Sequence, residues 1–178
     1  QGTQITINGR PVFLRGTLDC CVYPKTGHPP VAVDEWLRVL GRAKEHGFNH
    51  VRFHTWCPPE AAFAAADRLG LYLEPETPFW VDGWTRGTFS HPAALGRDPD
   101  VLDYVRREWA RMREVYGNHP SFALACIGNE FAQDATDWDA VERLVAEAAA
   151  ADPRRLYAGS TARRRTGADA CWITHSTG

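Results

Sequence analysis

The sequence predicts an α/β fold of the (β/α)8 TIM-barrel type, with about six of the eight βα units present. Strand-like and helix-like segments alternate along the chain, which is typical of a parallel sheet with helical connections. The long loops at 16–33 and 77–97 follow strands rather than helices, as the working loops of a barrel do. A complete barrel needs about 250 residues, so we expect an incomplete one, as a single domain over residues 1–178.

Periodicity and turn residues predict the individual elements. Asn8-Gly9 indicates a hairpin with a type I′ turn that leads into the first strand. Helices are expected to begin at Asp34, Pro59, Asp98 or Asp100, and Asp137, and mostly to end at glycines. The expected strands are the hairpin segments 4–7 and 11–15, then 48–54, 71–76, 121–127, 155–158 and 170–175. The expected helices are 34–47, 59–70, 98–116 and 137–150.

Composition and charge narrow the possible functions. The formal net charge of −2 does not favour nucleic acid as a partner, because a nucleic-acid-binding protein normally carries a basic face. The one basic cluster, 163–165 with Arg154 and Arg155 upstream, could meet an acidic sugar or be a solvated loop. We expect no membrane span, and we find no signal peptide. Because the chain starts at Gln1 rather than at an initiator methionine, we leave the compartment open.

The cysteines do not indicate a metal site. There are five, an odd number, and none is in CxxC spacing, so neither a zinc site nor a disulfide framework is predicted. Cys126 and Cys171 lie in apolar runs and are expected to be small buried hydrophobic residues. Cys20 and Cys21 are adjacent and cannot easily bridge each other. We therefore expect no metal and no cofactor.

Asn129-Glu130 is the pair on which the functional prediction depends. The two residues end the apolar run 121–128, which has the pattern of a buried strand. In an α/β barrel the C-terminal tip of such a strand is where catalytic groups lie. The alternative is that Asn-Glu only begins the following turn.

A family resemblance rests on stretches that occur in order along nearly the whole chain. They are INGRPVFLRG at 7–16, FNHVRFH at 48–54, RLGLYLEPE at 68–76, and NHPS at 118–121 continuing to the Asn-Glu pair. Together they resemble the TIM-barrel domain of glycoside hydrolase family 2, the β-galactosidase, β-glucuronidase and β-mannosidase family. The resemblance implies carbohydrate hydrolysis by a retaining exo-glycosidase-type domain, of the kind found in bacteria, acting on an oligosaccharide or glycoside.

The resemblance also implies roles for particular residues. Glu130 corresponds to the general acid/base, Asn129 to the asparagine that binds the sugar 2-hydroxyl, and Arg52 to the arginine beside the nucleophile. Arg52 could equally form a structural ion pair with Glu74 or Glu76. The family nucleophile lies on the seventh strand, which we do not expect within these residues, so we expect the chain to be inactive alone.

Two departures from the family pattern are visible. The histidine after the second strand, His54, stands one place earlier than in the family, which puts its role in doubt. Glu76 corresponds to a recurrent acid, but no histidine follows two places later, so we expect no metal there. The N-terminal domains of the family are not in this chain.

Further residues are candidates for the substrate-binding mouth. Asp19 could accept a hydrogen bond from a sugar hydroxyl, and aromatic rings there could stack on sugar faces or simply pack. The candidate substrate-binding residues are Asn129, Arg52, His54, Asp19, Trp56, Glu76, Trp80 and His175, with Trp84 and Trp172 nearby.

Two other functions remain open. The chain could be a carbohydrate-binding or scaffold module without chemistry. It could also be an enzyme whose missing strands come from another chain, since open strand edges invite self-association.

Overall fold

The computed structural model describes residues 4–79, 95–133, 135–161 and 164–171, and in them five strands form a parallel sheet. Strand β3 (Gly16–Asp19) pairs in parallel with β4 (His50–Phe53), which pairs in parallel with β5 (Tyr72–Pro75). Strand β6 (Leu124–Asn129) pairs in parallel with β7 (Leu156–Thr161). The α/β fold with parallel strands is the one that the sequence predicts.

Parallel bridges join the two groups of strands into one curved sheet. Leu73 of β5 bridges to Phe122, and Glu76 bridges to Cys126 of β6. The Leu73 amide donates to the Ser121 carbonyl at 2.7 Å. The strand order is therefore β3-β4-β5-β6-β7, which is the sequential order of a barrel. Within the described ranges β3 and β7 are not paired with each other, so these residues do not form a closed barrel.

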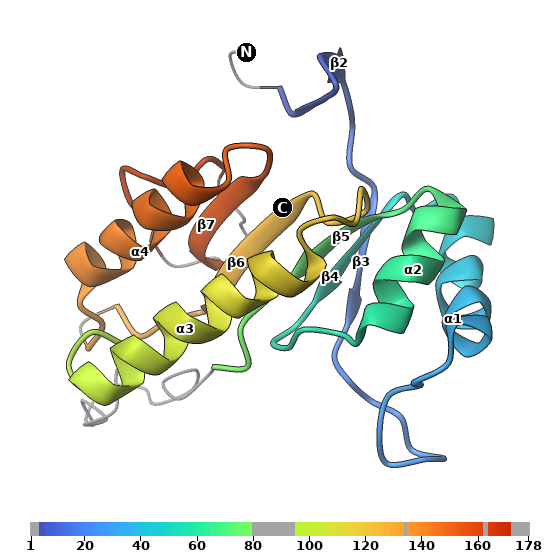
Figure 1. Cartoon of the computed structure of the whole chain (residues 1–178), viewed down its shortest axis with the longest axis horizontal. Helices are drawn as coiled ribbons and strands as arrows, with labels where there is room; N and C mark the ends of the chain where they lie inside the picture. The colour runs from blue at the N-terminus through green and yellow to red at the C-terminus, as the bar shows by residue number, and fades with distance from the viewer. Residues whose placement is uncertain (1–3, 80–94, 134, 162–163, 172–178) are drawn as a thin grey trace.

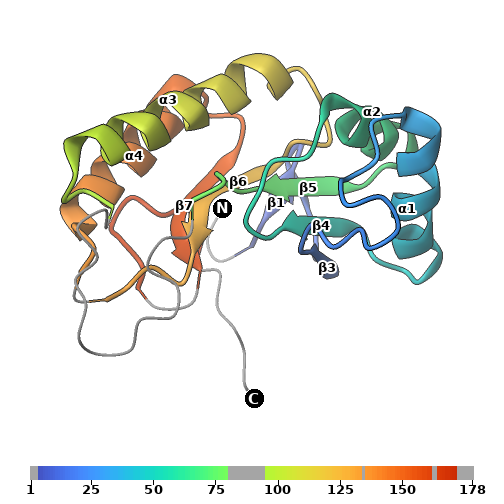
Figure 2. The same ribbon diagram turned by 90° about the horizontal axis from the view of Figure 1, so that it is seen from below.

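Each pair of consecutive parallel strands is connected by a helix on the outer side of the sheet (Figures 1 and 2). The helices are α1 (Val33–Glu45), α2 (Glu60–Leu69), α3 (Pro99–Tyr116) and α4 (Trp138–Ala151). The hydrophobic core lies between this helical layer and the outward side chains of the strands. Its largest fully buried members are Trp36, Trp109, Tyr157, Phe53 and Phe63. None of the helices in the described part is long and apolar enough to span a bilayer.

The helix boundaries agree closely with the sequence, with one corrected cap. Asp98 and Asp137 cap α3 and α4 through their side chains, and Gly70 ends α2 in the left-handed conformation. The cap of α1 is Ala32 and not Asp34, which lies in the first turn. A negative charge in the first turn still interacts favourably with the helix dipole. Asp34 therefore supports this end of the helix without the predicted hydrogen bond.

The first parallel strand was predicted wrongly. The hairpin does form, from β1 (Thr6–Ile7) and β2 (Arg10–Pro11), and positive φ at Asn8 and Gly9 fits the predicted type I′ turn. However, β3 lies at Gly16–Asp19, inside the predicted loop 16–33. A Cβ at Gly16 would come within 2.8 Å of the His50 ring, so the glycine permits close approach of two strands. From the sequence pattern alone, this glycine indicates the start of a loop rather than a strand residue.

The C-terminal strands also differ from the prediction. The strand expected at 155–158 is longer, because β7 continues to Thr161. Of the strand expected at 170–175, residues 172–175 lie outside the described residues. Ala170 and Cys171 are described, and they form a bend rather than a strand. Cys126 is fully buried as predicted, whereas Cys171 is only partly buried.

A polar contact between α2 and the start of β6 holds the lower end of the sheet. Asp67 accepts hydrogen bonds from the Ser121 amide (2.9 Å) and from His119 Nδ1 (2.6 Å). Partial burial by itself would raise the pKa of Asp67, but these hydrogen bonds and the charge of His119 lower it. The folded state therefore favours the ionised carboxylate.

We expect Asp67→Asn to destabilise the protein by about 1–2 kcal/mol at neutral pH. Because the pKa is lowered in the folded state, this contribution is present above the unfolded pKa of about 4 and is lost as pH falls through the folded value. Urea unfolding of both proteins from pH 7 to pH 3 measures the difference. Asp103→Asn, in an exposed pair with Arg107, should change stability little. A difference for Asp67→Asn that grows on acidification would contradict the assignment.

Candidate active site

The C-terminal ends of the parallel strands form one rim, and most described candidate residues lie on it. Asp19 ends β3, His54 follows β4, and Glu76 follows β5. Asn129 ends β6 and lies opposite Thr161 at the end of β7. Because all five strands run in the same direction, their polar ends gather at one edge of the sheet. The sheet topology therefore brings together residues more than a hundred positions apart.

Arg52 is the centre of a buried polar network on this rim. Its Nε donates to Glu76 Oε1 at 2.7 Å, and its Nη2 lies 2.5 Å from the same oxygen. Nη2 also donates to Asn129 Oδ1 (2.8 Å) and to Thr161 Oγ1 (3.2 Å). The Thr161 hydroxyl donates in turn to Asn129 Oδ1. Arg52 of β4 thus connects to Glu76 directly after β5, to Asn129 of β6 and to Thr161 of β7. Glu76 is one of the two ion-pair partners that the sequence left open.

Glu76 has no exposed surface, and opposing effects act on its pKa. Burial raises the pKa of this carboxyl, while the neighbouring His54 side chain and the charge of Arg52 lower it. Burial prevails, so the pKa of Glu76 is above its ordinary value. His54 Nδ1 lies 3.7 Å from Glu76 Oε2, on the side opposite Arg52. His54 therefore belongs to the same network, although the sequence put its role in doubt.

Glu130 follows directly after β6 and is half-buried at the rim. Its φ of 49° lies in the left-handed region, which is uncommon for a residue with a side chain. The backbone before this turn is closely packed, since a Cβ at Gly128 would meet the Phe131 ring at 2.8 Å and the Phe79 carbonyl at 2.9 Å. The Phe131 amide donates to Ser160 Oγ of β7 at 3.2 Å. The chain therefore turns at Glu130 in a fixed position, next to the anchored amide of Asn129.

Asp19 organises the loop after β3. Its Oδ1 accepts from the Cys21 amide and its Oδ2 from the Tyr23 hydroxyl, both at 2.8 Å. Its backbone carbonyl accepts from Trp56 Nε1 at 3.1 Å. Trp56 also packs edge-on against Phe53, with ring centroids 5.3 Å apart. Asp19 and Trp56 are thus tied to each other and to the aromatic core, and both remain partly exposed at the rim.

Two candidates cannot be placed. Trp80 and His175, with the neighbouring Trp84 and Trp172, lie outside the described residues. The basic cluster 163–165 is described only in part. Arg164 lies over the Trp138 ring at 5.4 Å, and Arg165 donates to the Asp169 carbonyl at 3.1 Å.

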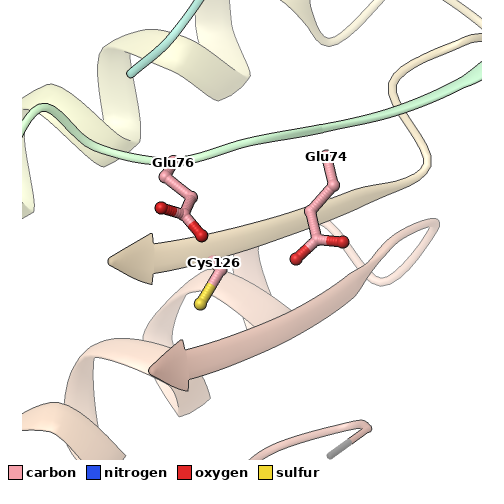
Figure 3. Close-up of side chains that lie close together, drawn as sticks. All are labelled: Glu74, Glu76 and Cys126. Atoms are coloured by element: carbon pink, nitrogen blue, oxygen red, sulfur yellow. The ribbon is translucent and has the colours of Figure 1, made fainter. Parts of the chain in front are cut away.

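A second group of ionisable residues lies deeper on the inner face of the sheet. His50 Nε2 lies 3.1 Å from Glu74 Oε2, and His50 Nδ1 lies 3.1 Å from the Tyr72 carbonyl. One oxygen each of Glu74 and Glu76 and the sulfur of Cys126 lie within 4.8 Å of one another. Figure 3 shows the three side chains close together. Burial, followed by the charges of Glu76 and Glu74, raises the pKa of the Cys126 thiol well above its ordinary value. These are described residues that could hold a metal ion.

Sequence reasoning missed three members of these groups. Thr161 was missed because the strand predicted at 155–158 stopped three residues short of it. Continuing the strand by three residues would have placed Thr161 at its tip. His50 and Cys126 gave no local signal, because one begins a strand and the other resembles a core residue. Only the pairing of β4, β5 and β6 brings them to the same face.

The profile of the TIM barrel domain of glycosyl hydrolases family 2 matches residues 1–171 of the 178 in this chain. The chain belongs to glycosyl hydrolase family 2. The β-galactosidase of Aeromonas hydrophila subsp. hydrophila is 30% identical over 132 residues, which cover 73% of this chain and 12% of that protein. The β-galactosidase of Leuconostoc mesenteroides subsp. mesenteroides is 30% identical over 128 residues, or 71% of this chain and 12% of that protein.

Solved structures of family 2 enzymes share the fold. The apo structure of Bacteroides uniformis β-glucuronidase 3 superposes with a TM-score of 0.63 at 26% identity, over 84% of this chain and 19% of that one. A family 2 β-galacturonidase from Eisenbergiella tayi, bound to galacturonate, gives a TM-score of 0.74 at 21% identity, over 92% of this chain and 28% of that one. The family 2 chain described here thus spans a minor part of the length of its relatives.

Proposed function

We propose that this family 2 domain provides the acid/base half of a retaining glycosidase site, with Glu130 as the general acid/base. The observation that carries the proposal is the position of Glu130 beside Asn129, whose amide is held by Arg52 and Thr161 at the rim of the parallel sheet. Anchored groups at a strand tip are what a site needs to hold a substrate in reactive geometry. The relatives named β-galactosidase and β-glucuronidase support a β-linked glycoside as substrate.

The proposed reaction has two steps. In the first, the Glu130 carboxyl gives its proton to the glycosidic oxygen while the bond from that oxygen to C1 breaks, and a second carboxylate bonds to C1. In the second, Glu130 takes a proton from water, whose oxygen bonds to C1 and releases the second carboxylate. We assign that nucleophile to the seventh parallel strand of a complete barrel. The label β7 refers to the fifth parallel strand, and a seventh is not among the described strands. The 178 residues alone are then expected to give no turnover.

Asn129 is the proposed ligand of the sugar 2-hydroxyl. Its Oδ1 accepts hydrogen bonds from both Arg52 and Thr161, which fixes the orientation of the amide. The Nδ2 group is then the donor that remains for a substrate hydroxyl. A hydrogen bond at the 2-hydroxyl strengthens as positive charge develops on the sugar ring, so it stabilises the transition state more than the ground state.

A panel of aryl β-glycosides tests the proposed function in a polypeptide that also supplies the remaining barrel strands. We expect hydrolysis of at least one member, with the β-configuration retained in the first product detected by NMR. Inversion, or sugar binding without turnover of any member, would overturn the proposal, and the second outcome would favour a carbohydrate-binding module.

Replacing Asn129 by alanine is expected to reduce kcat/KM by about 10²-fold or more, because several kcal/mol come from contacts at this hydroxyl. The loss should be much smaller on a 2-deoxy glycoside, which lacks the partner hydroxyl. The comparison of both enzymes on both substrates isolates this contact. Equal losses on the two substrates would assign Asn129 a structural role.

A further inference from the structure

We propose that Glu74, Glu76 and Cys126 form a site for a divalent transition-metal ion of the zinc class, on the inner face of the sheet. One oxygen of each carboxylate and the Cys126 sulfur lie within 4.8 Å of one another. Figure 3 shows both carboxylates extending from the β5 segment toward the thiol on β6. The parallel bridge between Glu76 and Cys126 fixes the segment after β5 against β6 at this point.

An unpartnered oxygen points to a ligand at this place. Glu74 is only 3% exposed, and its Oε1 has no hydrogen-bond partner among the described residues, while Oε2 contacts His50. A buried carboxylate oxygen without a partner is costly, and native structures normally satisfy such groups. A cation between Glu74 and Glu76 would satisfy it, and no new protein donor would be needed.

The charges on this face balance when a divalent cation is added. Glu74, Glu76 and a Cys126 thiolate carry three negative charges, and Arg52 carries one positive charge. A divalent ion brings the sum to zero with both nearby histidines neutral. Arg52 holds Glu76 through Oε1, at 2.7 Å from its Nε. The other oxygen, Oε2, has no hydrogen-bond partner among the described residues, and a metal ion there would replace its 3.7 Å approach to His54 Nδ1. Buried charge is tolerated when it is compensated in this way.

The donor atoms select the class of metal. Two carboxylate oxygens and one sulfur suit Zn²⁺ and its neighbours, whereas Mg²⁺ and Ca²⁺ prefer oxygen ligands alone. Tetrahedral zinc needs ligand atoms about 3.5 Å apart. Side-chain rotations that move these atoms by about 1 Å would bring them to that separation. On binding, the metal–sulfur bond forms as the thiol proton leaves to solvent. The thiol also gives up its contact with the Gly128 carbonyl at 3.2 Å.

An open groove reaches Glu74, the outermost of the three proposed ligands. A groove of about 430 Å³ is lined by residues of β3, β4 and β5, among them His50, Arg52 and Glu74. The alternative to a metal is that the Cys126 thiol keeps its proton and that Glu74 is held by its contact with His50. The two states differ in one measurable property, a metal–sulfur bond.

Cobalt titration distinguishes the two states. Cys20 and Cys21 are exposed and could bind metal adventitiously, so both are first changed to serine. In that background we expect stoichiometric Co²⁺ to produce a near-ultraviolet sulfur-to-metal charge-transfer band, which Zn²⁺ removes by competition. The additional change Cys126→Ala should abolish the band, and the matched change Cys57→Ala should leave it intact. No band in the starting background, or a band that survives Cys126→Ala, would overturn the proposal.

A second variant covers the case in which Cys126→Ala does not fold. Glu74→Gln keeps the shape of the side chain and a hydrogen-bond acceptor for His50, but it removes one negative charge from the site. We expect it to weaken Co²⁺ binding at least about tenfold, read from the same band. Added Zn²⁺ should raise the thermal unfolding temperature of the starting protein and raise it less in Glu74→Gln. Equal affinity and equal thermal shifts in the two proteins would also contradict the site.

Discussion

Replacing Glu130 by glutamine is expected to reduce kcat/KM for a glycoside with a poorly acidic leaving alcohol by about 10²–10⁴-fold. Glutamine preserves the size of the side chain and leaves Asn129 in place, but it has no proton to give to the leaving oxygen. The loss should be measured in a polypeptide with a complete barrel, with initial rates on alkyl and aryl glycosides of the same sugar.

The leaving group separates acid catalysis from a structural effect. A nitrophenolate leaves without a proton, so Glu130→Gln should slow the first step little on a nitrophenyl glycoside. The second step still needs a base, so the covalent intermediate should accumulate after a burst. Azide, which needs no base, should restore turnover and give a glycosyl azide. A uniform loss on all substrates without azide rescue would remove Glu130 from this role. Glu114→Gln, on the exposed face of α3, serves as the control.

Replacing Arg52 by methionine is expected to destabilise the protein by about 3–5 kcal/mol, the largest effect on stability that we anticipate. Methionine fills much of the space of the arginine but leaves the Glu76 carboxylate buried without its ion-pair partner. It also removes the donor to Asn129 and Thr161, which lie on two other strands. Urea unfolding measures the loss.

A double-mutant cycle separates the ion pair from the other contacts of Arg52. Glu76→Gln combined with Arg52→Met should be less destabilised than the sum of the two single changes, because no unpaired charge remains. Arg38→Met, on the exposed face of α1, should change stability by less than about 0.5 kcal/mol. Additive single and double changes would mean that Arg52 and Glu76 do not depend on each other.

The local elements were predictable because their signals are local. Alternating strands and helices, the caps Asp98 and Asp137, and the glycine stop at Gly70 depend on residues only a few positions apart. The position of strand β3 was not predicted, because a glycine such as Gly16 usually indicates a turn. Here a glycine is needed because the His50 side chain of the neighbouring strand approaches it closely. A contact of this kind leaves no periodic trace in the sequence.

The same distinction applies to the candidate site. The positions of Glu130, Asn129 and Arg52 at the rim could be predicted because short motifs near strand ends carry them. Thr161, which contacts Arg52 and Asn129, was not predicted, and neither was the position of Cys126 beside Glu74 and Glu76.

The sequence by itself determined the family, the parallel α/β class and the residues at the strand tips, because chain pattern and motif spacing encode them. Only the tertiary structure decided which ionisable side chains face each other: Arg52 with Glu76, and Glu74 with His50 and Cys126. Sheet register sets these pairings. A shift of one residue between two strands would turn each side chain to the opposite face, and no short stretch of sequence fixes that register.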